Sequence, residues 1–513
     1  MAPIKHVFVL MLENRSFDHL LGFSGLTGAD AVTGAPTQID APPPGASNSW
    51  NGKSFPAGPP PVDPMTVDPY HEFSDVLEHL CGPGAAYPQG GPYPTIKNSG
   101  FVSNFAVAAK ASSPADVMRC FSPARLPVLC ALAKEFAVCD SWFCSMPGPT
   151  FPNRFFALGA SSGELDHSPT SAETLLWQTI DGFKFQNGSI FEAGGGFFSF
   201  LPWKRKLKWR IYAGNTIFTL AHALKGIHIW DISRYAKFAG DVGNPNYDAE
   251  FTWIEPNYGH VTSDYLGGNS QHPLDGVTGG EALIRATYEA IRNSPLWESS
   301  LFIVTWDEHG GFFDHVAPQR AVPPGDQAQF SGANRYGFAF DLYGPRVPAV
   351  IISPLIPRNT IDHRIYDHSS LLATVERLFG LRPLTARDRA ALDLRALASL
   401  SAPRQVPTDL FALPPEAELA HRQVMLDTLE IEAPPPTRPD EPVERNDNRH
   451  GNLPGFIHVV AKTDRELPPP GVPPGAHSLR VRERVTTIRT RGDAHAYFEE
   501  VRRKTAAYEA GRR

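Results

Sequence analysis

The chain lacks any long hydrophobic segment. Nowhere do about eighteen apolar residues follow one another, which is the length that a membrane-spanning helix requires. The apolar run nearest the amino terminus, Val7 to Leu12, is too short for the hydrophobic region of a secretory signal, and no small-residue cleavage site follows it. We therefore expect no membrane span, and a protein that is either cytoplasmic or secreted after the loss of a leader.

Cysteine is also scarce, and charge of neither sign dominates. The five cysteines lie between positions 81 and 144 without a C-x-x-C pair. Their odd number leaves at least one thiol free unless it pairs with another chain. A net charge of −7 over 513 residues gives no reason to expect nucleic acid as a partner. The length predicts one large domain plus additions.

The most informative segment is 301–315, LFIVTWDEHGGFFDH. Its first five residues are apolar or β-branched and predict a short strand that is buried on both faces. Asp307 and Glu308 follow directly, and two glycines then allow a sharp turn. The carboxyl end of a buried strand is where open α/β sheets bind ligands. A capped strand end with solvated charges is the alternative interpretation.

A second polar group follows the apolar run at residues 7–12, which we interpret as the first buried strand. Glu13 and Asn14 come next, and Ser16 is placed to cap a helix that begins with Phe17. Carboxylate and amide oxygens are ligands suited to a divalent cation. Together with the acidic pair after the late strand, they predict a metal site between the two strand ends.

Thr150 lies in a tight turn, SMPGPTFPNR at residues 145–154. Prolines and a glycine fix this turn, and Thr150 would lie at or near the amino end of a helix. Backbone N–H groups there favour an oxyanion or a phosphate. A hydroxyl beside a metal can lose its proton and attack. Without the acidic groups, Thr150 would be interpreted as a turn residue or helix cap.

Three motifs carry a family resemblance: ENRSFDH at 13–19, PGPTFPNR at 147–154 and DEHGGFFDH at 307–315. Together they resemble the bacterial phospholipase C and acid phosphatase family, a branch of the alkaline phosphatase superfamily, over roughly residues 4–400. The resemblance implies an α/β fold: a mixed, mostly parallel sheet flanked by helices, with loop-rich insertions.

The resemblance also implies roles for single residues. It gives Thr150 as a nucleophile that also touches the metal, His71 and His272 as histidines that line the phosphate site, and Glu13, Asn14, Asp307 and Glu308 as metal ligands. We expect one divalent ion; oxygen ligands favour calcium, magnesium or manganese, and nearby histidines admit zinc or iron. His71 would also lie at a helix start, where a partly positive end lowers the pKa of a histidine.

We expect two-step phosphoryl transfer. Thr150 attacks the phosphorus, His272 or His315 protonates the departing alcohol, and water releases the phosphothreonine. A phosphodiester such as a phospholipid headgroup is the favoured substrate, with at most peripheral membrane contact. The alternatives are an acid phosphomonoesterase of broad specificity, and a non-catalytic binding protein in which a metal joins Asp307 and Glu13. The sequence leaves the oligomeric state open.

We expect a catalytic domain over residues 1–400 and, over 401–513, Pro-rich linkers and a helical extension that packs on the core. Residues 30–66 form a loop-rich insertion. The basic segment 203–209 suits anionic headgroups or a solvated turn equally. Apolar periodicity predicts helices over 72–80, 126–136, 281–292, 416–430 and 493–513, a helix that Asp367 caps and that ends at Gly380, and strands over 136–143 and 348–353.

Overall fold

The computed structural model describes residues 4–195, 205–328, 330–408, 410–411, 433–444 and 451–510. The helix expected over residues 416–430 and the first two residues of the basic segment lie outside these ranges. The strands of the main sheet are β1 (His6–Leu12), β2 (Thr27–Asp30), β3 (Pro36–Gln38), β6 (Ala137–Cys139), β9 (Trp209–Ala213), β10 (Ile232–Arg234), β11 (Phe251–Glu255), β12 (Ser300–Trp306), β13 (Ala349–Ile352) and β14 (Thr360–Asp362).

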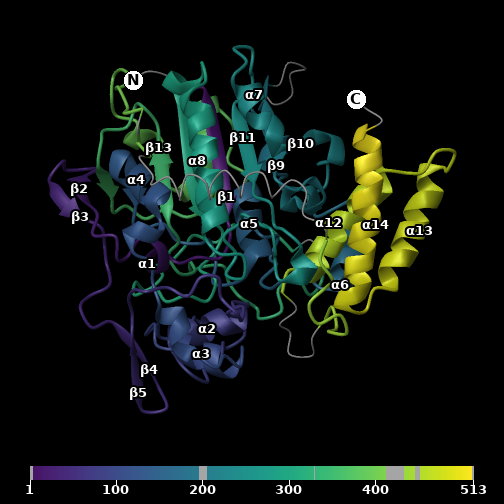
Figure 1. The fold of residues 1–513 in the computed structure, drawn as a ribbon, viewed down its shortest axis with the longest axis horizontal. Coiled ribbons are helices and arrows are strands. Elements are labelled where there is room, and N and C mark those ends of the chain that lie inside the picture. Colours follow the sequence, from purple (N-terminus) through teal and green to yellow (C-terminus); the bar gives the residue numbers. More distant parts are fainter. Residues whose placement is uncertain are drawn as a thin grey trace.

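These strands form one ten-stranded sheet at the centre of the fold (Figure 1) in the order β10-β9-β11-β1-β12-β13-β6-β14-β2-β3. β1 pairs in parallel with both β11 and β12. β13 runs against β12 and β6, and β3 runs against β2. The sheet is therefore mixed and mostly parallel, and the expected fold class is confirmed.

Helices surround this sheet. They are α1 (Phe17–Leu20), α2 (Phe73–Cys81), α3 (Phe101–Val107), α4 (Pro127–Glu135), α5 (Thr150–Gly159), α6 (Ser171–Thr179), α7 (Phe238–Val242), α8 (Thr278–Arg292), α9 (Ser369–Phe379), α10 (Ala386–Ala390), α12 (Leu453–Glu466), α13 (Pro474–Thr486) and α14 (Arg491–Ala510). α1, α2 and α3 lie beyond the lower ends of the strands in Figure 1.

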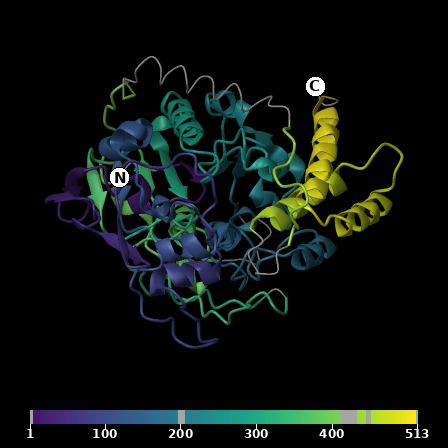
Figure 2. The same cartoon turned by 60° about the horizontal axis from the view of Figure 1, so that its bottom comes forward.

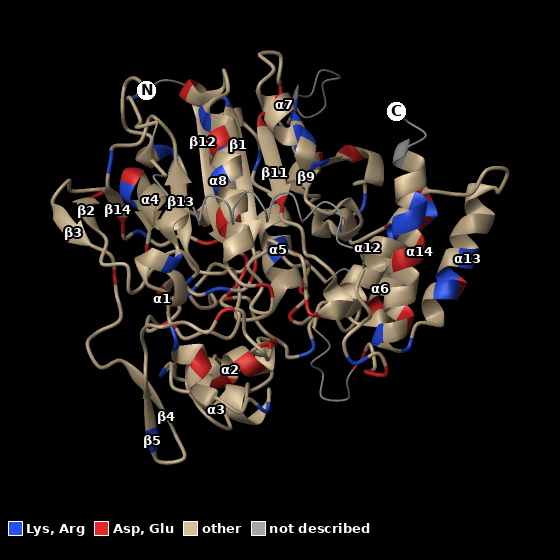
Figure 3. Cartoon of the chain, in the orientation of Figure 1, with Lys and Arg blue, Asp and Glu red and all other residues tan. Residues whose placement is uncertain are grey.

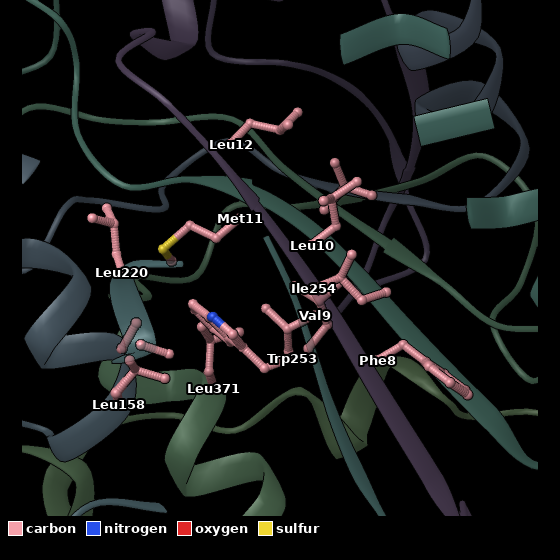
Figure 4. Packing of buried hydrophobic residues seen from close by; sticks show 14 of the residues in the cluster. Phe8, Val9, Leu10, Met11, Leu12, Leu158, Leu220, Trp253, Ile254 and Leu371 are labelled. Carbon is pink, nitrogen blue, oxygen red and sulfur yellow. The ribbon is translucent and has the colours of Figure 1, made fainter. Parts of the chain in front are cut away.

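Both faces of the central strands are covered. Every residue of β12, and every residue of β1 except His6, is buried. Side chains alternate along β1: Figure 4 shows Val9 and Met11 on the side of Leu158 in α5, whereas Phe8 points to the opposite side. Phe8 meets Phe238 of α7 edge to face, with the ring centres 6.0 Å apart. Burial on both faces explains why these strands are continuous apolar runs.

Most of the expected elements are present. β1, β12 and β13 form where apolar runs predicted strands, and α2, α4, α8 and α14 form where periodicity predicted helices. The strand expected over residues 136–143 is shortened to β6. The expected cap of α9 is wrong, because its N-cap residue is His368. The Asp367 carboxylate instead accepts from Ser145 Oγ at 2.9 Å and from Arg387 at 3.2 Å.

The segment over residues 30–66 adds the edge strand β3 to the sheet and then extends away from it. It contains a two-stranded hairpin of β4 (Ser47–Trp50) and β5 (Lys53–Pro56), which projects below the sheet in Figure 1. The hairpin is anchored by Asn48, whose Oδ1 accepts from the N–H of Phe101 at 3.0 Å. It therefore packs on α3, outside the central core.

The carboxyl-terminal helices α12, α13 and α14 lie together on one side of the molecule (yellow in Figures 1 and 2). α12 contacts both α13 and α14, and it also contacts α6 and the segment Leu220–Ala223 of the core. Most residues of α12 are buried. In the described part of the chain, no helix combines the length and apolar character needed to span a membrane.

Candidate functional site

The acidic residues that follow β1 and β12 lie side by side at the carboxyl edge of the sheet. The strands are parallel neighbours with Leu12 beside Trp306 in the register, so Glu13 and Asp307 follow at the same level. The backbone N–H of Asp307 donates to the carbonyl of Leu12 at 3.2 Å. That of Asn14 donates to Asp307 Oδ1 at 3.0 Å. The structure thus brings together the two polar groups that the sequence separates by almost 300 residues.

The two turns that leave this edge pack directly on each other. Asn14 has a φ of 60°, a left-handed conformation that asparagine tolerates better than most residues. Gly310 has a φ of 64°, and a Cβ there would lie 2.1 Å from the carbonyl oxygen of Asn14. The N–H of Gly310 donates to Glu308 Oε2 at 2.7 Å. Only glycine fits this turn, which also fixes the Glu308 carboxylate.

Thr150 is the first residue of α5, and its side chain is fully buried at the same edge. Asn153 holds the preceding turn: it accepts from the N–H of Met146 at 3.1 Å and donates to the carbonyl of Gly148 at 3.0 Å. The Thr150 hydroxyl lies 3.5 Å from Asn14 Oδ1, to which it donates. The turn therefore presents the hydroxyl to the strand ends.

Arg154, one helical turn after Thr150, ties α5 to both strands. Its Nε donates to Asp307 Oδ2 at 2.9 Å, and its Nη2 donates to the carbonyls of Met11 at 3.3 Å and Leu12 at 3.1 Å. Its guanidinium is buried. Charge-assisted hydrogen bonds of this kind are stronger than neutral ones. Arg154 therefore fixes the position of the helix that carries Thr150.

His71 contacts both polar groups. Its Nε2 lies 3.4 Å from Asn14 Nδ2 and 3.6 Å from Glu308 Oε1, and its Nδ1 bonds the carbonyl of Pro69 at 2.8 Å. Burial lowers the pKa of His71, but the carboxylates of Glu308 and Asp68 outweigh it and raise the pKa to about 9. The expected lowering at the helix start is therefore wrong, because neighbouring charges dominate over the helix end.

His272 lies in the loop between β11 and α8. Its Nε2 lies 3.6 Å from Asp68 Oδ2, and its ring stacks on Tyr265 with the ring centres 3.7 Å apart. Arg15 donates to the carbonyls of Gln271 at 2.7 Å and His272 at 3.3 Å, which holds this loop. Burial lowers the pKa of His272 well below its usual value, and the positive charges nearby add to that effect.

A cavity of about 520 Å³ lies next to these groups, since His71 and Asn452 line it and contact Asn14 and Thr150. Its walls include Asp68, His71, Tyr265, His272 and Asn452. Figure 3 shows acidic and basic segments mixed in the loops beyond the carboxyl ends of the strands. Burial raises the pKa of the Asp68 carboxyl to about 6, and the charge of His71 counteracts that rise. The pocket is thus lined by several ionisable side chains and is large enough for a substrate of moderate size.

The acidic groups fit a divalent cation. Both carboxylate oxygens of Glu13 and Oε1 of Glu308 are buried and, among the described residues, have no hydrogen-bond partner. Burial raises the pKa of Glu13 well above its usual value; Arg154 counteracts this, and Asp307 adds to it. Buried carboxylates without partners are costly unless a cation pairs with them. The oxygens of Asp307 already accept hydrogen bonds and offer only their remaining lone pairs.

His315 lies in a different group of side chains. It pairs with Asp18 at 2.7 Å and with Asp40 at 3.3 Å, and it is not among the residues that line the pocket. Asp18, Asp314 and His315 offer donor atoms within 4.8 Å of one another. Arg346, however, bonds both Asp18 at 2.8 Å and Asp314 at 2.9 Å. The positive charge that this group needs is therefore already present in the chain.

Sequence reasoning gave no role to three residues of the site: Arg154, Asp68 and Asn452. Arg154 ends the PGPTFPNR motif, and its spacing of four from Thr150 places both on one face of a helix. Asp68 lies three residues before His71 in the segment DPYH, and a carboxylate so close to a candidate site histidine could have indicated a role for it. Asn452 has no local signal, because it reaches Thr150 only through the packing of the carboxyl-terminal helices.

A buried hydroxyl and buried carboxylates at the carboxyl edge of an α/β sheet, next to a pocket that two histidines line, are typical of a hydrolytic enzyme. The chain belongs to the Phosphoesterase family, whose model matches residues 4–382. The family resemblance carried by the three motifs is thereby confirmed, and so is the expectation of a phosphoric ester hydrolase.

Several relatives are named as phospholipases. Non-specific phospholipase C3 of Arabidopsis thaliana is 33% identical over 80% of this chain and 77% of its own length. Non-specific phospholipase C6 of the same plant is 35% identical over 79% and 74%. Phospholipase C B of Mycobacterium tuberculosis is 27% identical over 79% of each chain. Among solved structures, an alkaline phosphatase superfamily protein from Vibrio parahaemolyticus aligns over 53% of this chain and 65% of its own, with 14% identity and a TM-score of 0.30.

Proposed function

We propose that this protein is a metal-dependent phospholipase C-type phosphodiesterase that acts through Thr150. The observation that carries the proposal is the position of the buried Thr150 hydroxyl, 3.5 Å from Asn14 Oδ1 at the sheet edge where Glu13 and Glu308 keep buried oxygens without hydrogen-bond partners among the described residues. The names of the relatives support the substrate class, a phospholipid. A protein that merely used a cation to join two strands would gain nothing from a hydroxyl presented at that point.

In the first step, Thr150 Oγ1 attacks the phosphorus of the ester. The hydroxyl is buried at the start of a ten-residue helix, whose backbone N–H groups and partly positive end favour the phosphoryl oxygens. Arg154 keeps that helix in place against Asp307. The Oγ1–P bond forms as the P–O bond to one alcohol breaks, so Thr150 carries the phosphoryl group with its second ester still attached. The Thr150 hydroxyl loses its proton, and the departing alkoxide takes up one.

His71, which lines the pocket and whose pKa neighbouring carboxylates raise to about 9, is the candidate for donating that proton. His272 also lines the pocket, but burial lowers its pKa, which suits it to accept a proton. His315 is set aside as a proton donor because it is paired with Asp18 and Asp40. In the second step His71 accepts a proton from water, which attacks the phosphothreonine and restores Thr150.

The residues that would hold a divalent cation are Glu13, Asn14, Thr150, Asp307 and Glu308. When bound, it neutralises charge on the phosphoryl oxygens and favours the deprotonated hydroxyl. The oxygen donors suit calcium, magnesium or manganese, and His71 at 3.6 Å from Glu308 admits zinc or iron.

The test compares p-nitrophenyl phosphorylcholine with p-nitrophenyl phosphate, with and without a chelator. We expect hydrolysis of the diester that the chelator abolishes and that added metal restores. Thr150→Ala should lose at least about a hundredfold in kcat, whereas Thr150→Ser, which keeps a hydroxyl, should keep part of it. Preference for the monoester would replace the diesterase by an acid phosphatase, and full activity of Thr150→Ala would remove the covalent step.

A further inference from the structure

Asn452, in the carboxyl-terminal extension, contacts the proposed nucleophile directly. Its Nδ2 donates to Thr150 Oγ1 at 3.1 Å, across 302 residues of sequence. The side chain is 6% exposed. This is a shorter contact than the 3.5 Å from Thr150 to Asn14 Oδ1. The hydroxyl thus accepts from one asparagine and donates to the other, which fixes the direction of its proton.

Helix capping does not explain this asparagine. Asn452 is the N-cap residue of α12, but its side chain makes no capping hydrogen bond. Its Oδ1 is buried and, within the described ranges, has no hydrogen-bond partner. An amide with one buried group unpaired destabilises the fold. Its position beside Thr150 therefore calls for a reason other than local structure.

Close packing of two helices holds Asn452 in place. A Cβ at Gly455 would lie 2.2 Å from the ring of Phe151, so only a glycine lets the first turn of α12 approach the first turn of α5 this closely. Phe456 packs edge to face on Phe218 with the ring centres 5.6 Å apart. The two helices that carry Asn452 and Thr150 are thus in direct contact at their amino ends.

Asn452 also lines the pocket, together with Tyr265 and His272. The ring of Tyr265 stacks on His272, which faces Asp68. The residue that contacts the Thr150 hydroxyl therefore also borders the cavity that His71 and His272 line.

We propose that Asn452 is a positioning residue for Thr150, so that the carboxyl-terminal extension completes the active site. Its N–H orients the hydroxyl for attack and stabilises negative charge on Oγ1 when the phosphothreonine is hydrolysed. The same extension contributes Arg438, Glu441 and Arg491 to the pocket wall. This inference rests on the proposed role of Thr150 as the nucleophile.

The test uses the full chain and p-nitrophenyl phosphorylcholine. Asn452→Ala should lower kcat by about ten- to a hundredfold and change KM far less, because the lost contact is to the attacking oxygen. Asn452→Asp, which keeps the shape but not the donor, should fall at least as far and also serves if the alanine variant does not fold. Asn452→Gln, which keeps an N–H donor, should recover part of kcat.

Tyr497→Phe is the matched control. It removes a hydrogen bond to Asp464 at 3.0 Å inside the extension, away from the pocket-lining residues. We expect it to keep kcat near the wild-type value. Wild-type kcat in Asn452→Ala, with Thr150→Ala inactive, would overturn the inference and leave the proposed function intact. Equal loss in all Asn452 variants and in Tyr497→Phe, with a lowered Tm, would reduce Asn452 to a structural role. Activity in Thr150→Ala would overturn both.

Discussion

Arg154 and Asp307 form a buried ion pair, with 2.9 Å between Nε and Oδ2 and side chains that are 2% and 0% exposed. The pair joins the helix that begins with Thr150 to the strand end that carries the acidic residues. Removing one partner of a buried pair leaves the other charge without compensation, which costs more than the pair itself contributes. The same ion pair therefore stabilises the carboxyl edge of the sheet and holds the helix that begins with Thr150 in position.

Arg154→Lys should lower both stability and kcat. Lysine keeps the charge but cannot donate at once to Asp307 and to the carbonyls of Met11 and Leu12, as Arg154 does. We expect a destabilisation of about 1–3 kcal/mol in urea unfolding, because buried acceptors lose their donors, and a kcat lowered at least tenfold. Arg285→Lys, at a half-buried pair with Glu289 on α8, is the control and should leave both near wild type. A variant with unchanged kcat would show that Arg154 does not set the position of Thr150.

Glu13→Gln should lower the metal content of the purified protein. The two oxygens of Glu13 are buried without partners, and a neutral amide at that position holds a divalent cation poorly. Elemental analysis should find about one divalent ion per wild-type chain and clearly less in the variant. A chelator should lower the Tm of wild type more than that of the variant. Asp248→Asn, at an exposed surface carboxylate, is the control. Equal metal in wild type and Glu13→Gln would exclude Glu13 as a ligand.

Gly310→Ala should lower kcat by more than the conformational cost of an alanine at positive φ would. An alanine in this backbone conformation costs about 1 kcal/mol, and here its Cβ would also meet the carbonyl of Asn14 at 2.1 Å. Gly325 has a comparable φ of 75° with nothing within 4 Å, so Gly325→Ala pays only the conformational cost. We expect kcat to fall at least tenfold in Gly310→Ala and to stay unchanged in Gly325→Ala. Similar kcat in both variants would show that the contact between the two turns does not control catalysis.

The sequence predicted the two strand ends well because each signal is local. An apolar run followed by polar residues identifies β1 and β12, and parallel pairing then places Glu13 beside Asp307. The antiparallel direction of β13 could not be predicted, because an apolar run does not indicate whether its strand pairs parallel or antiparallel with its neighbours. The expected cap at Asp367 failed because tertiary partners, Ser145 and Arg387, take its carboxylate.

At the site, too, the residues that the sequence misplaced or missed are those whose positions depend on tertiary packing. His315 follows the acidic pair by only a few residues, but the turn at Gly310 and Gly311 carries it to Asp18 instead of the pocket. Asn452 is the opposite case: it is remote in sequence and arrives through the packing of Gly455 on Phe151. Neither outcome is encoded in spacing, because both depend on how separate helices and turns pack.

His315 should make stability fall as the pH rises above neutrality. Burial lowers the pKa of His315, but hydrogen bonds to Asp18 and Asp40 outweigh it and raise the pKa to about 9. A folded-state pKa above the unfolded value means that the contribution is fully present below about pH 6.5 and is lost as the pH rises through 9. Burial raises the pKa of the Asp314 carboxyl to about 6, so this group is mostly ionised below the pH range in which His315 loses its proton.

The measurement is urea unfolding of wild type and His315→Gln at intervals from pH 7 to pH 9. Wild type should lose no more than about 2–3 kcal/mol across this range, and the variant should lose clearly less, because glutamine cannot bind the proton. At pH 7 the variant should be the less stable of the two, since Asp18 then keeps Arg346 as a partner but loses the imidazolium. Its kcat at pH 7 should stay near wild type, because both ring nitrogens of His315 pair with Asp18 and Asp40 instead of with a residue beside Thr150. Parallel pH profiles would show that the charge of His315 does not stabilise the fold, and a large loss of kcat would return His315 to the list of proton donors.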